Sequence, residues 1–318
     1  MDFLTSCLVN GPLVFLNFLA NAFFLFCMVC PLHGEKIKQP LKLLLWTFIY
    51  CTVTYMISVL INFCVTYAPL MLASYTVFVF SLSTHMTTSV WLNFFYYAQI
   101  VPARRATFIW IKKNIKSVIF FAWLVDKMFC SLDVCVVLAD YIALLNYRSH
   151  ALSYNITMHD DTIYLEIPSF QQDVIAILIC FMRAKFIISL CIMVLSSGST
   201  VVYLCKHMQR MVANGQPFSC PRFKSQLRVT TTGLLQGVLF VICAMFTVYK
   251  YFSQDILTGS QSGYSFTHFT VINVYMVGTT FSLGAGQSVF RQRAEDMWFR
   301  AVQWLKAPEV QQSKQEGR

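Results

Sequence analysis

Long, nearly uncharged apolar runs dominate this sequence and leave room for few folds other than a membrane bundle. A run of about 18 residues or more can cross a hydrocarbon layer of about 30 Å as a helix. Seven such runs are found, at about 8–30, 43–67, 77–101, 117–143, 174–205, 229–252 and 266–290. With 57% hydrophobic and 12% charged residues, the 318-residue chain is too apolar for a soluble domain. The sequence therefore predicts an all-α, integral membrane bundle of seven transmembrane helices.

The charges of the connecting segments predict the orientation of this bundle. Lys and Arg gather after the first, third, fifth and seventh runs, at Lys36, Lys38, Lys42, Arg104, Arg105, Lys112, Lys113, Lys116, Lys206, Arg210, Arg222, Lys224, Arg228, Arg291, Arg293, Arg300 and Lys306. The segments of the other side contain only Arg148 and Lys250. Short basic loops face the cytoplasm, so we expect the N-terminus outside and the C-terminus inside. The same bias explains the net charge of +10, and no nucleic-acid partner is expected.

The charge and hydropathy pattern divides the chain into two parts. Residues 1–290 form the predicted transmembrane domain, and residues 291–318 form a cytoplasmic tail. Apolar residues recur at helical spacing among the cations of the tail, which favours a short amphipathic helix over 291–306 on the anionic inner leaflet. A frayed polar tail is the alternative. The residues beyond Pro308 are predicted to be disordered.

One glycosylation sequon lies in the longest predicted outer segment, 146–173. It reads Asn155-Ile156-Thr157, and modification of Asn155 requires an outer location. The sequon therefore agrees with the orientation that the basic residues predict.

Ionisable residues inside the apolar runs are the most unusual feature of the chain. Asp126, Asp133 and Asp140 are spaced seven apart and share one face of the fourth span, and Arg183 and Lys185 lie at the depth of Asp133 in the fifth. Such groups are costly in lipid and should face the bundle interior. We weigh three interpretations: an ion pair of Asp133 with Arg183 or Lys185, a polar contact of either cation in a ligand cavity, and a proton or ion pathway.

The third run contains a polar stripe that predicts a cavity wall. Thr84, Thr87 and Trp91 recur at helical spacing in its outer half. Hydroxyl groups and one amphipathic ring in apolar surroundings are typical of small-molecule sites. In the alternative interpretation the hydroxyls bond their own helix and Trp91 packs on a neighbour. The lone His85 is interpreted as structural.

Residue patterns that indicate catalysis, a metal site or a cofactor are missing from the sequence. It has no HExxH, GxSxG or phosphate-binding loop, and its cysteines and histidines lack metal-ligand spacing. We therefore expect no enzyme, no metal and no cofactor. A transporter is disfavoured because no matching pair of Gly/Pro-broken spans is visible in two halves.

Several stretches resemble the type 2 (bitter) taste receptors, a family of G-protein-coupled receptors. FYYAQIVPARRATFIWIKKNIKSVI follows the family's pattern across the third and fourth spans, and LCKHMQRM and GQSVFRQ follow it at the ends of the fifth and seventh. The matching residues are Asn21, Phe95, Tyr96, Ile100, Phe108, Lys112, Lys116, Val118, Ile119, Lys206, His207, Met211, Gly286, Ser288 and Gln292. The resemblance spans nearly the whole chain.

The chain departs from this family at several positions, so the resemblance is to a divergent, fish-like member. The second span lacks the family's LAxSR, Thr279-Thr280 replace a His-Ser pair, and Thr87 stands where family pockets carry a tryptophan. The features of rhodopsin-like receptors, among them Asp/Glu-Arg-Tyr after the third span, are missing both from this chain and from the bitter taste receptors. Type 1 vomeronasal receptors are the nearest alternative, and a small-molecule transporter is a more distant one.

The resemblance implies a receptor in the plasma membrane that binds a small, largely apolar bitter molecule in an outer cavity. The expected ligand contacts are Thr84, Thr87, Trp91, Arg183, Phe246, His268 and Phe269. The implied intracellular partner is a heterotrimeric G protein of the Gi/gustducin type. Its expected contacts are Gln99, Arg104, Lys112, His207 and Lys224. Homo- or hetero-oligomers are left open.

Overall fold

Helices account for all the regular structure that the computed structural model describes, which covers residues 3–30, 39–64, 67–102, 105–153, 169–214, 221–253 and 266–316. In these ranges there are nine helices and no strand. They are α1 (Phe3–Val29), α2 (Leu41–Cys64), α3 (Ala68–Ile100), α4 (Ala106–Lys113), α5 (Ile115–Ser153), α6 (Ser169–Ala213), α7 (Pro221–Ser253), α8 (Phe266–Gly286) and α9 (Ser288–Glu316). The all-helical class predicted from the apolar runs is confirmed.

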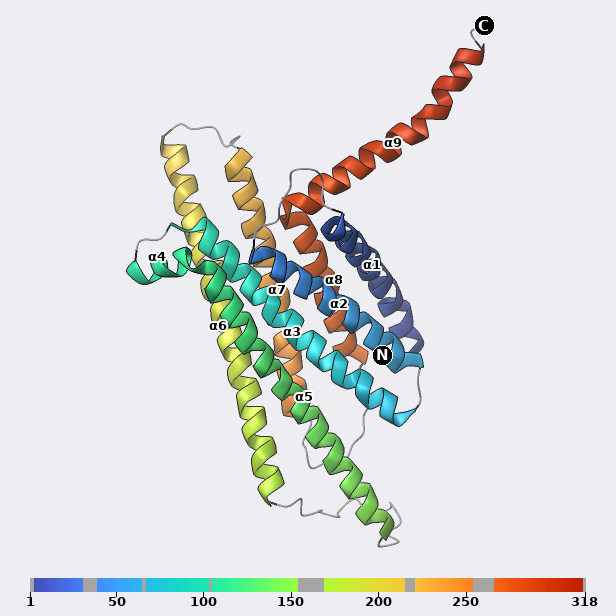
Figure 1. Ribbon diagram of the computed structural model, residues 1–318, viewed down its shortest axis with the longest axis vertical. Coiled ribbons are helices and arrows are strands. Elements are labelled where there is room, and N and C mark those ends of the chain that lie inside the picture. Colours follow the sequence, from blue (N-terminus) through green and yellow to red (C-terminus); the bar gives the residue numbers. More distant parts are fainter. Residues whose placement is uncertain are drawn as a thin grey trace.

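Five of the described helices are long and apolar enough to cross a membrane. The spans are Cys7–Val29, Leu41–Asn62, Pro69–Ile100, Ala176–Ala213 and Phe223–Thr247. The other two predicted runs lie in α5 and α8. α5 carries Asp126, Lys127 and Asp133 in its apolar stretch, and α8 is rich in Ser, Thr and Gly. Both are nevertheless part of the bundle, because α5 packs against α3 and α6, and α8 against α1 and α7 (Figure 1).

α3 is the central helix of the bundle, in contact with α2, α5, α6 and α7. All ten residues from Ser81 to Val90 are buried, although this stretch, SLSTHMTTSV, is mostly polar. Small hydroxylated side chains let helices approach closely and form hydrogen bonds across the interface inside a membrane bundle. The middle of α3 thus provides polar groups to the interior of an apolar protein.

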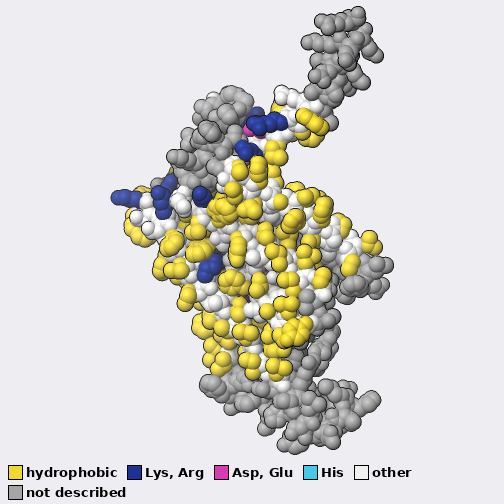
Figure 2. Space-filling model, turned by 45° about the vertical axis from the view of Figure 1, so that its right-hand side comes forward, with side chains coloured by type: hydrophobic (Ala, Val, Ile, Leu, Met, Phe, Trp, Pro, Cys, Tyr) yellow, Lys and Arg dark blue, Asp and Glu magenta, His cyan; other side chains and the backbone are white. Residues whose placement is uncertain are grey.

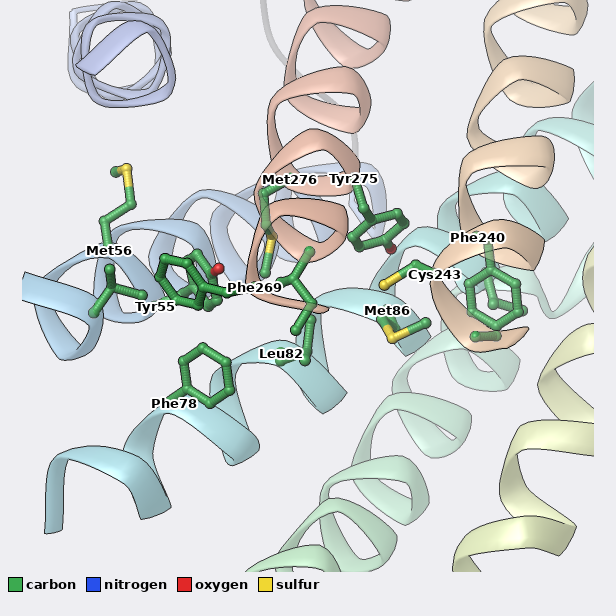
Figure 3. Packing of buried hydrophobic residues seen from close by; sticks show 14 of the residues in the cluster. Tyr55, Met56, Phe78, Leu82, Met86, Phe240, Cys243, Phe269, Tyr275 and Met276 are labelled. Atoms are coloured by element: carbon green, nitrogen blue, oxygen red, sulfur yellow. The ribbon is translucent and has the colours of Figure 1, made fainter. Parts of the chain in front are cut away.

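Two apolar clusters hold the helices together around and beyond this polar stretch. The first apolar cluster, which includes Tyr55, Phe240 and Phe269, joins α2, α3, α6, α7 and α8 (Figure 3). The second apolar cluster, which includes Phe24 and Leu92, joins α1, α2, α3, α5, α8 and the start of α9. Because lipid tails are as apolar as these side chains, close packing rather than removal from water holds such helices together.

Apolar side chains cover most of the visible face of the bundle, and most of the Lys and Arg side chains on this face lie toward one end (Figure 2). Phe121, Met128 and Leu195 are each at least 68% exposed. An apolar surface of this extent is unfavourable in water and is expected of helices that face lipid.

Two segments differ from the structure that the sequence predicts. The basic turn after the third run contains a short helix, α4, whose last turn carries Lys112 and Lys113. Cations at this position stabilise a helix through its dipole. The tail helix α9 continues to Glu316 instead of ending near Lys306. The Glu, Gln and Lys residues after Pro308 have good intrinsic helix propensity, which favours this extension.

Candidate ligand site

A buried ion pair joins α5 to α6 at the level of the polar stretch of α3. Lys185 Nζ donates to Asp133 Oδ2, and the two side chains are 8% and 3% exposed. The hydroxyl of Ser83 on α3 donates to the same carboxylate oxygen and accepts a hydrogen bond from Lys185 Nζ at 2.6 Å. Buried charges are tolerated when each has a partner and further hydrogen bonds. Three helices therefore meet at this ion pair.

A second carboxylate of α5 also reaches α3. Thr87 Oγ1 lies 2.6 Å from Asp126 Oδ2, and Lys127 Nζ lies 3.1 Å from the same oxygen. The Thr87 hydroxyl is also 3.1 Å from the carbonyl oxygens of Ser83 and Thr84 in its own helix. Its single proton can therefore go to the carboxylate or to the backbone. The side chain of Asp140 lies outside the described residues.

A small hollow lies beside the ion pair, between α3, α6 and α7. It has an empty volume of about 200 Å³ that includes its open mouth. The residues that line it are Ser83, Met86, Thr87, Lys185, Phe186, Ser189 and Phe240. Its polar members come from α3 and α6, and its aromatic rings from α6 and α7. A few polar groups in apolar walls can orient a small molecule while the rings cover its apolar surface.

One member of the predicted ligand set lines this hollow, and three more have buried or hydrogen-bonded surroundings elsewhere. Thr87 lines it, and Thr84 is buried one turn before, with no hydrogen-bond partner for its hydroxyl among the described residues. Phe269 belongs to the first apolar cluster, which also contains Phe240 of the hollow (Figure 3). His268 Nε2 lies 3.4 Å from Thr247 Oγ1.

The other predicted ligand residues do not line the hollow. Trp91 packs against the second apolar cluster, with its ring edge-on to that of Phe94. Phe246 of α7 is 40% exposed on the outside of the bundle. Arg183 is exposed as well, and it precedes Lys185 by two residues. Two residues turn a helix by about 200°, so these two cations point to nearly opposite sides of α6.

The hollow also includes residues that sequence reasoning missed, and some of them had a detectable signal. Ser83 lies one turn before Thr87, and Ser189 lies one turn after Lys185, so helical spacing could have added both hydroxyls. Phe240 had no such signal, because the chain contains 29 Phe residues in similarly apolar surroundings. Its inclusion depends on the packing of α7 against α3 and α6.

The lone histidine of the polar stretch, His85, is completely buried. Its ring centroid lies 4.1 Å from that of Phe48 and 5.4 Å from that of Tyr275. Its two ring nitrogens have no hydrogen-bond partner in the part of the chain that the structure describes. The ring packs between two aromatic neighbours, an environment that fits the structural role predicted for it.

Predicted contacts of an intracellular partner lie at helix ends near the basic end of the bundle. Gln99 is exposed in the last turn of α3, and Lys224 is exposed in the first turn of α7. Lys112 in α4 has its Nζ 3.4 Å from the carbonyl oxygen of Val101. Arg104 lies outside the described residues, as does the glycosylation candidate Asn155.

An aromatic contact connects α6 to α7 near the same end. The ring of His207 is stacked on that of Phe223, with centroids 5.7 Å apart and planes inclined by 17°. Leu204, Met211 and Phe223 form a small buried cluster around it. His207 thus makes one of the contacts between α6 and α7 in this structure.

Comparison with known families agrees with the motifs. A family model described as "Taste receptor protein (TAS2R)" matches residues 40–301, from the start of α2 into α9. No curated protein matches the chain. The matched segment contains the ion pair, the hollow and the stacked His207, and the predicted resemblance to bitter taste receptors is confirmed. The chain therefore belongs to the TAS2R taste receptor family of G-protein-coupled receptors.

Proposed function

We propose that this chain is a chemosensory receptor of the bitter-taste type that binds small, largely apolar molecules and activates a heterotrimeric G protein. Membership in a taste receptor family supports this general class over an enzyme or a transporter. The observation that carries the ligand part is the hollow, where Thr87 and Lys185 meet the rings of Phe186 and Phe240. A ligand shifts the equilibrium of such a receptor toward the active state only if it binds that state more tightly than the inactive one.

The proposed topology has seven spans, with the N-terminus outside, the C-terminus inside and the chain in the plasma membrane. Five apolar helices, together with the packing of α5 and α8 within the same bundle, support the seven spans. The basic connecting segments support the orientation. In this topology Asn155 is on the outer side and can carry a glycan.

The proposed ligand contacts centre on Thr87, which is the predicted residue that lines the hollow. We propose Thr84, His268 and Phe269 as further contacts, more distant from the ligand than Thr87. The remaining predicted contacts, Trp91, Arg183 and Phe246, are expected to contribute less.

The proposed partner inside the cell is a G protein of the Gi/gustducin type. Gln99, Lys112, His207 and Lys224, with Arg104 in the adjoining segment, form its proposed contact surface. A basic rim attracts an acidic partner surface and raises the rate of encounter. Separation of the stacked rings of His207 and Phe223 would let the ends of α6 and α7 part for this partner.

Calcium imaging of cells that express the chain with a promiscuous G protein tests this function. We expect agonists among small, largely apolar bitter compounds. Phe240→Ala should lower agonist potency roughly tenfold or more, because the ligand loses an aromatic contact in the wall of the hollow. Thr87→Val keeps the shape of the side chain and removes its hydroxyl. It should also lower the potency of agonists that bond to this hydroxyl.

Phe246→Ala is the matched control, since it removes the same side chain from the same helix at a position that does not line the hollow and is expected to contribute less. Surface display of each variant is measured with an N-terminal tag on intact cells. A wild-type receptor that reaches the surface and responds to none of the compounds contradicts the proposed function. Equal potency losses for Phe240→Ala and Phe246→Ala contradict the proposed site.

A further inference from the structure

We propose that the ligand of the hollow carries a hydrogen-bond acceptor or an anionic group on its apolar body, that this group binds the ammonium of Lys185, and that cationic amines are disfavoured. This inference rests on the proposed function and names the ligand class for the same site.

The two partners of the ion pair are placed differently with respect to the hollow. Lys185 is part of its wall, whereas Asp133 is not among the lining residues and is only 3% exposed. Ser83 and Lys185 both direct hydrogen bonds to Oδ2 of this carboxylate. A molecule in the hollow therefore meets the ammonium first, and the carboxylate lies behind it.

The ammonium of Lys185 retains a donor for a ligand. A lysine ammonium has three N–H donors and no acceptor. Asp133 and Ser83 take two of these donors, and no hydrogen bond from the third is found within the described ranges. A carbonyl, sulfonyl or carboxylate oxygen can accept from the third donor while the ion pair stays intact.

No carboxylate among the lining residues can pair with a cationic ligand. Asp126, the other described carboxylate at this level, does not line the hollow and is engaged by Thr87 and Lys127. A ligand ammonium would lie beside the charge of Lys185, and such repulsion is strong where water is scarce. The charges around the hollow thus select acceptors and anions over amines.

The rest of the hollow suits an apolar body. Phe186 and Phe240 supply rings, and Met86 supplies a flexible thioether that can repack around different shapes. In this structure the enclosed part of the hollow, without its open mouth, has space for about one water molecule. The ligand consequently binds a widened form, in which α3, α6 and α7 have moved apart.

Matched probe compounds test this ligand class. The first series has one phenyl ring and consists of acetophenone, benzoate, 1-phenylethylamine and ethylbenzene. The second has two rings and consists of benzophenone, diphenylacetate, benzhydrylamine and diphenylmethane. In the calcium assay, the ketone and the carboxylate should be roughly tenfold or more as potent as the hydrocarbon, because they add a charge-assisted hydrogen bond. The amine should be the weakest member of each series.

Two double variants test whether this preference comes from the ion pair. Asp133→Lys combined with Lys185→Asp exchanges the charges and presents a carboxylate to the hollow, so the amines should become the most potent probes. Asp133→Asn combined with Lys185→Met removes both charges without leaving one unpaired, and should abolish the preference. The neutral pair serves as the second test if the exchanged pair does not reach the surface.

The outcomes separate the ligand class from the proposed function. If wild-type cells respond to the probes but amines equal or exceed the ketones and carboxylates, the inference is overturned and the receptor function stands. If the preference for acceptors persists in the neutral pair, Lys185 is not its source and the inference is overturned as well. If a surface-displayed wild-type receptor responds to no probe of either series and to no bitter compound, the proposed function fails together with the inference.

Discussion

Gly284 lies where α8 touches α1, and its replacement by alanine tests that packing. A Cβ at this position would meet Phe24 Cζ at 2.8 Å and Cε1 at 3.2 Å. The Phe24 ring has little room to move, because it is 4% exposed and stacked on Phe290 with the ring centroids 4.3 Å apart. Overpacking costs about 1–3 kcal/mol, and the helix propensity of alanine returns up to about 1 kcal/mol.

We therefore expect Gly284→Ala to lower the free energy of unfolding by about 1 kcal/mol. For a chain of 318 residues, that corresponds to a fall of roughly 1–2 °C in the melting temperature. The measurement is thermal unfolding of the purified receptor in detergent, followed with a thiol-reactive dye.

Gly198→Ala in α6 is the matched control. No described residue lies within 4 Å of a Cβ at that position, so the same chemical change should leave the melting temperature equal or slightly higher. A Gly284→Ala receptor that melts at or above the wild-type temperature, with Gly198→Ala unchanged, would refute the packing of α8 on α1 described above.

Three further predictions concern other parts of the chain. Asp133→Ala should reduce surface display and cost about 3–5 kcal/mol, because it leaves the ammonium of its partner buried and unpaired; normal display in a flow-cytometry assay would contradict the ion pair. Tyr55→Phe removes the hydroxyl that donates to Asn273 Oδ1 at 2.8 Å, so it should cost about 1 kcal/mol in thermal unfolding, whereas Tyr50→Phe at a 67% exposed position should not. Asn155→Gln should increase the electrophoretic mobility of receptor from cells to that of glycosidase-treated wild type, and an unchanged band would contradict an outer, glycosylated loop.

The main helices could be predicted from the sequence because each apolar run is far longer than a chance stretch. The ends were less predictable. Basic and amphipathic residues such as Lys112 are compatible with a turn as well as with the short helix α4, and only the described structure distinguishes them. Likewise, the residues after Pro308 are polar enough to suggest disorder, yet Gln, Glu and Lys also favour the helix that continues to Glu316.

The candidate site was less accessible to sequence reasoning for a related reason. Counting residues along each span gives the depth of a residue in the membrane. By this count Asp133 lies at the same depth as both Arg183 and Lys185. The choice between the two cations depends on which face of α6 turns inward. In a helix that is apolar all round, periodicity carries little information about that face. For the same reason, the sequence could not show that Phe240 points into the bundle and Phe246 points outward.

The Thr87 hydroxyl in the polar stretch of α3 has two bonding choices, and this affects how easily the receptor can rearrange. Thr87 can give its proton to Asp126 on the neighbouring helix or to a carbonyl oxygen one turn back. When α3 slides or rotates against α5, the bond between helices can break without stranding an unsatisfied polar group in a medium that contains little water. Thr87 thus has a substitute within its own helix for this lost contact, which lowers the barrier for the small helix displacements on which transmembrane signalling depends.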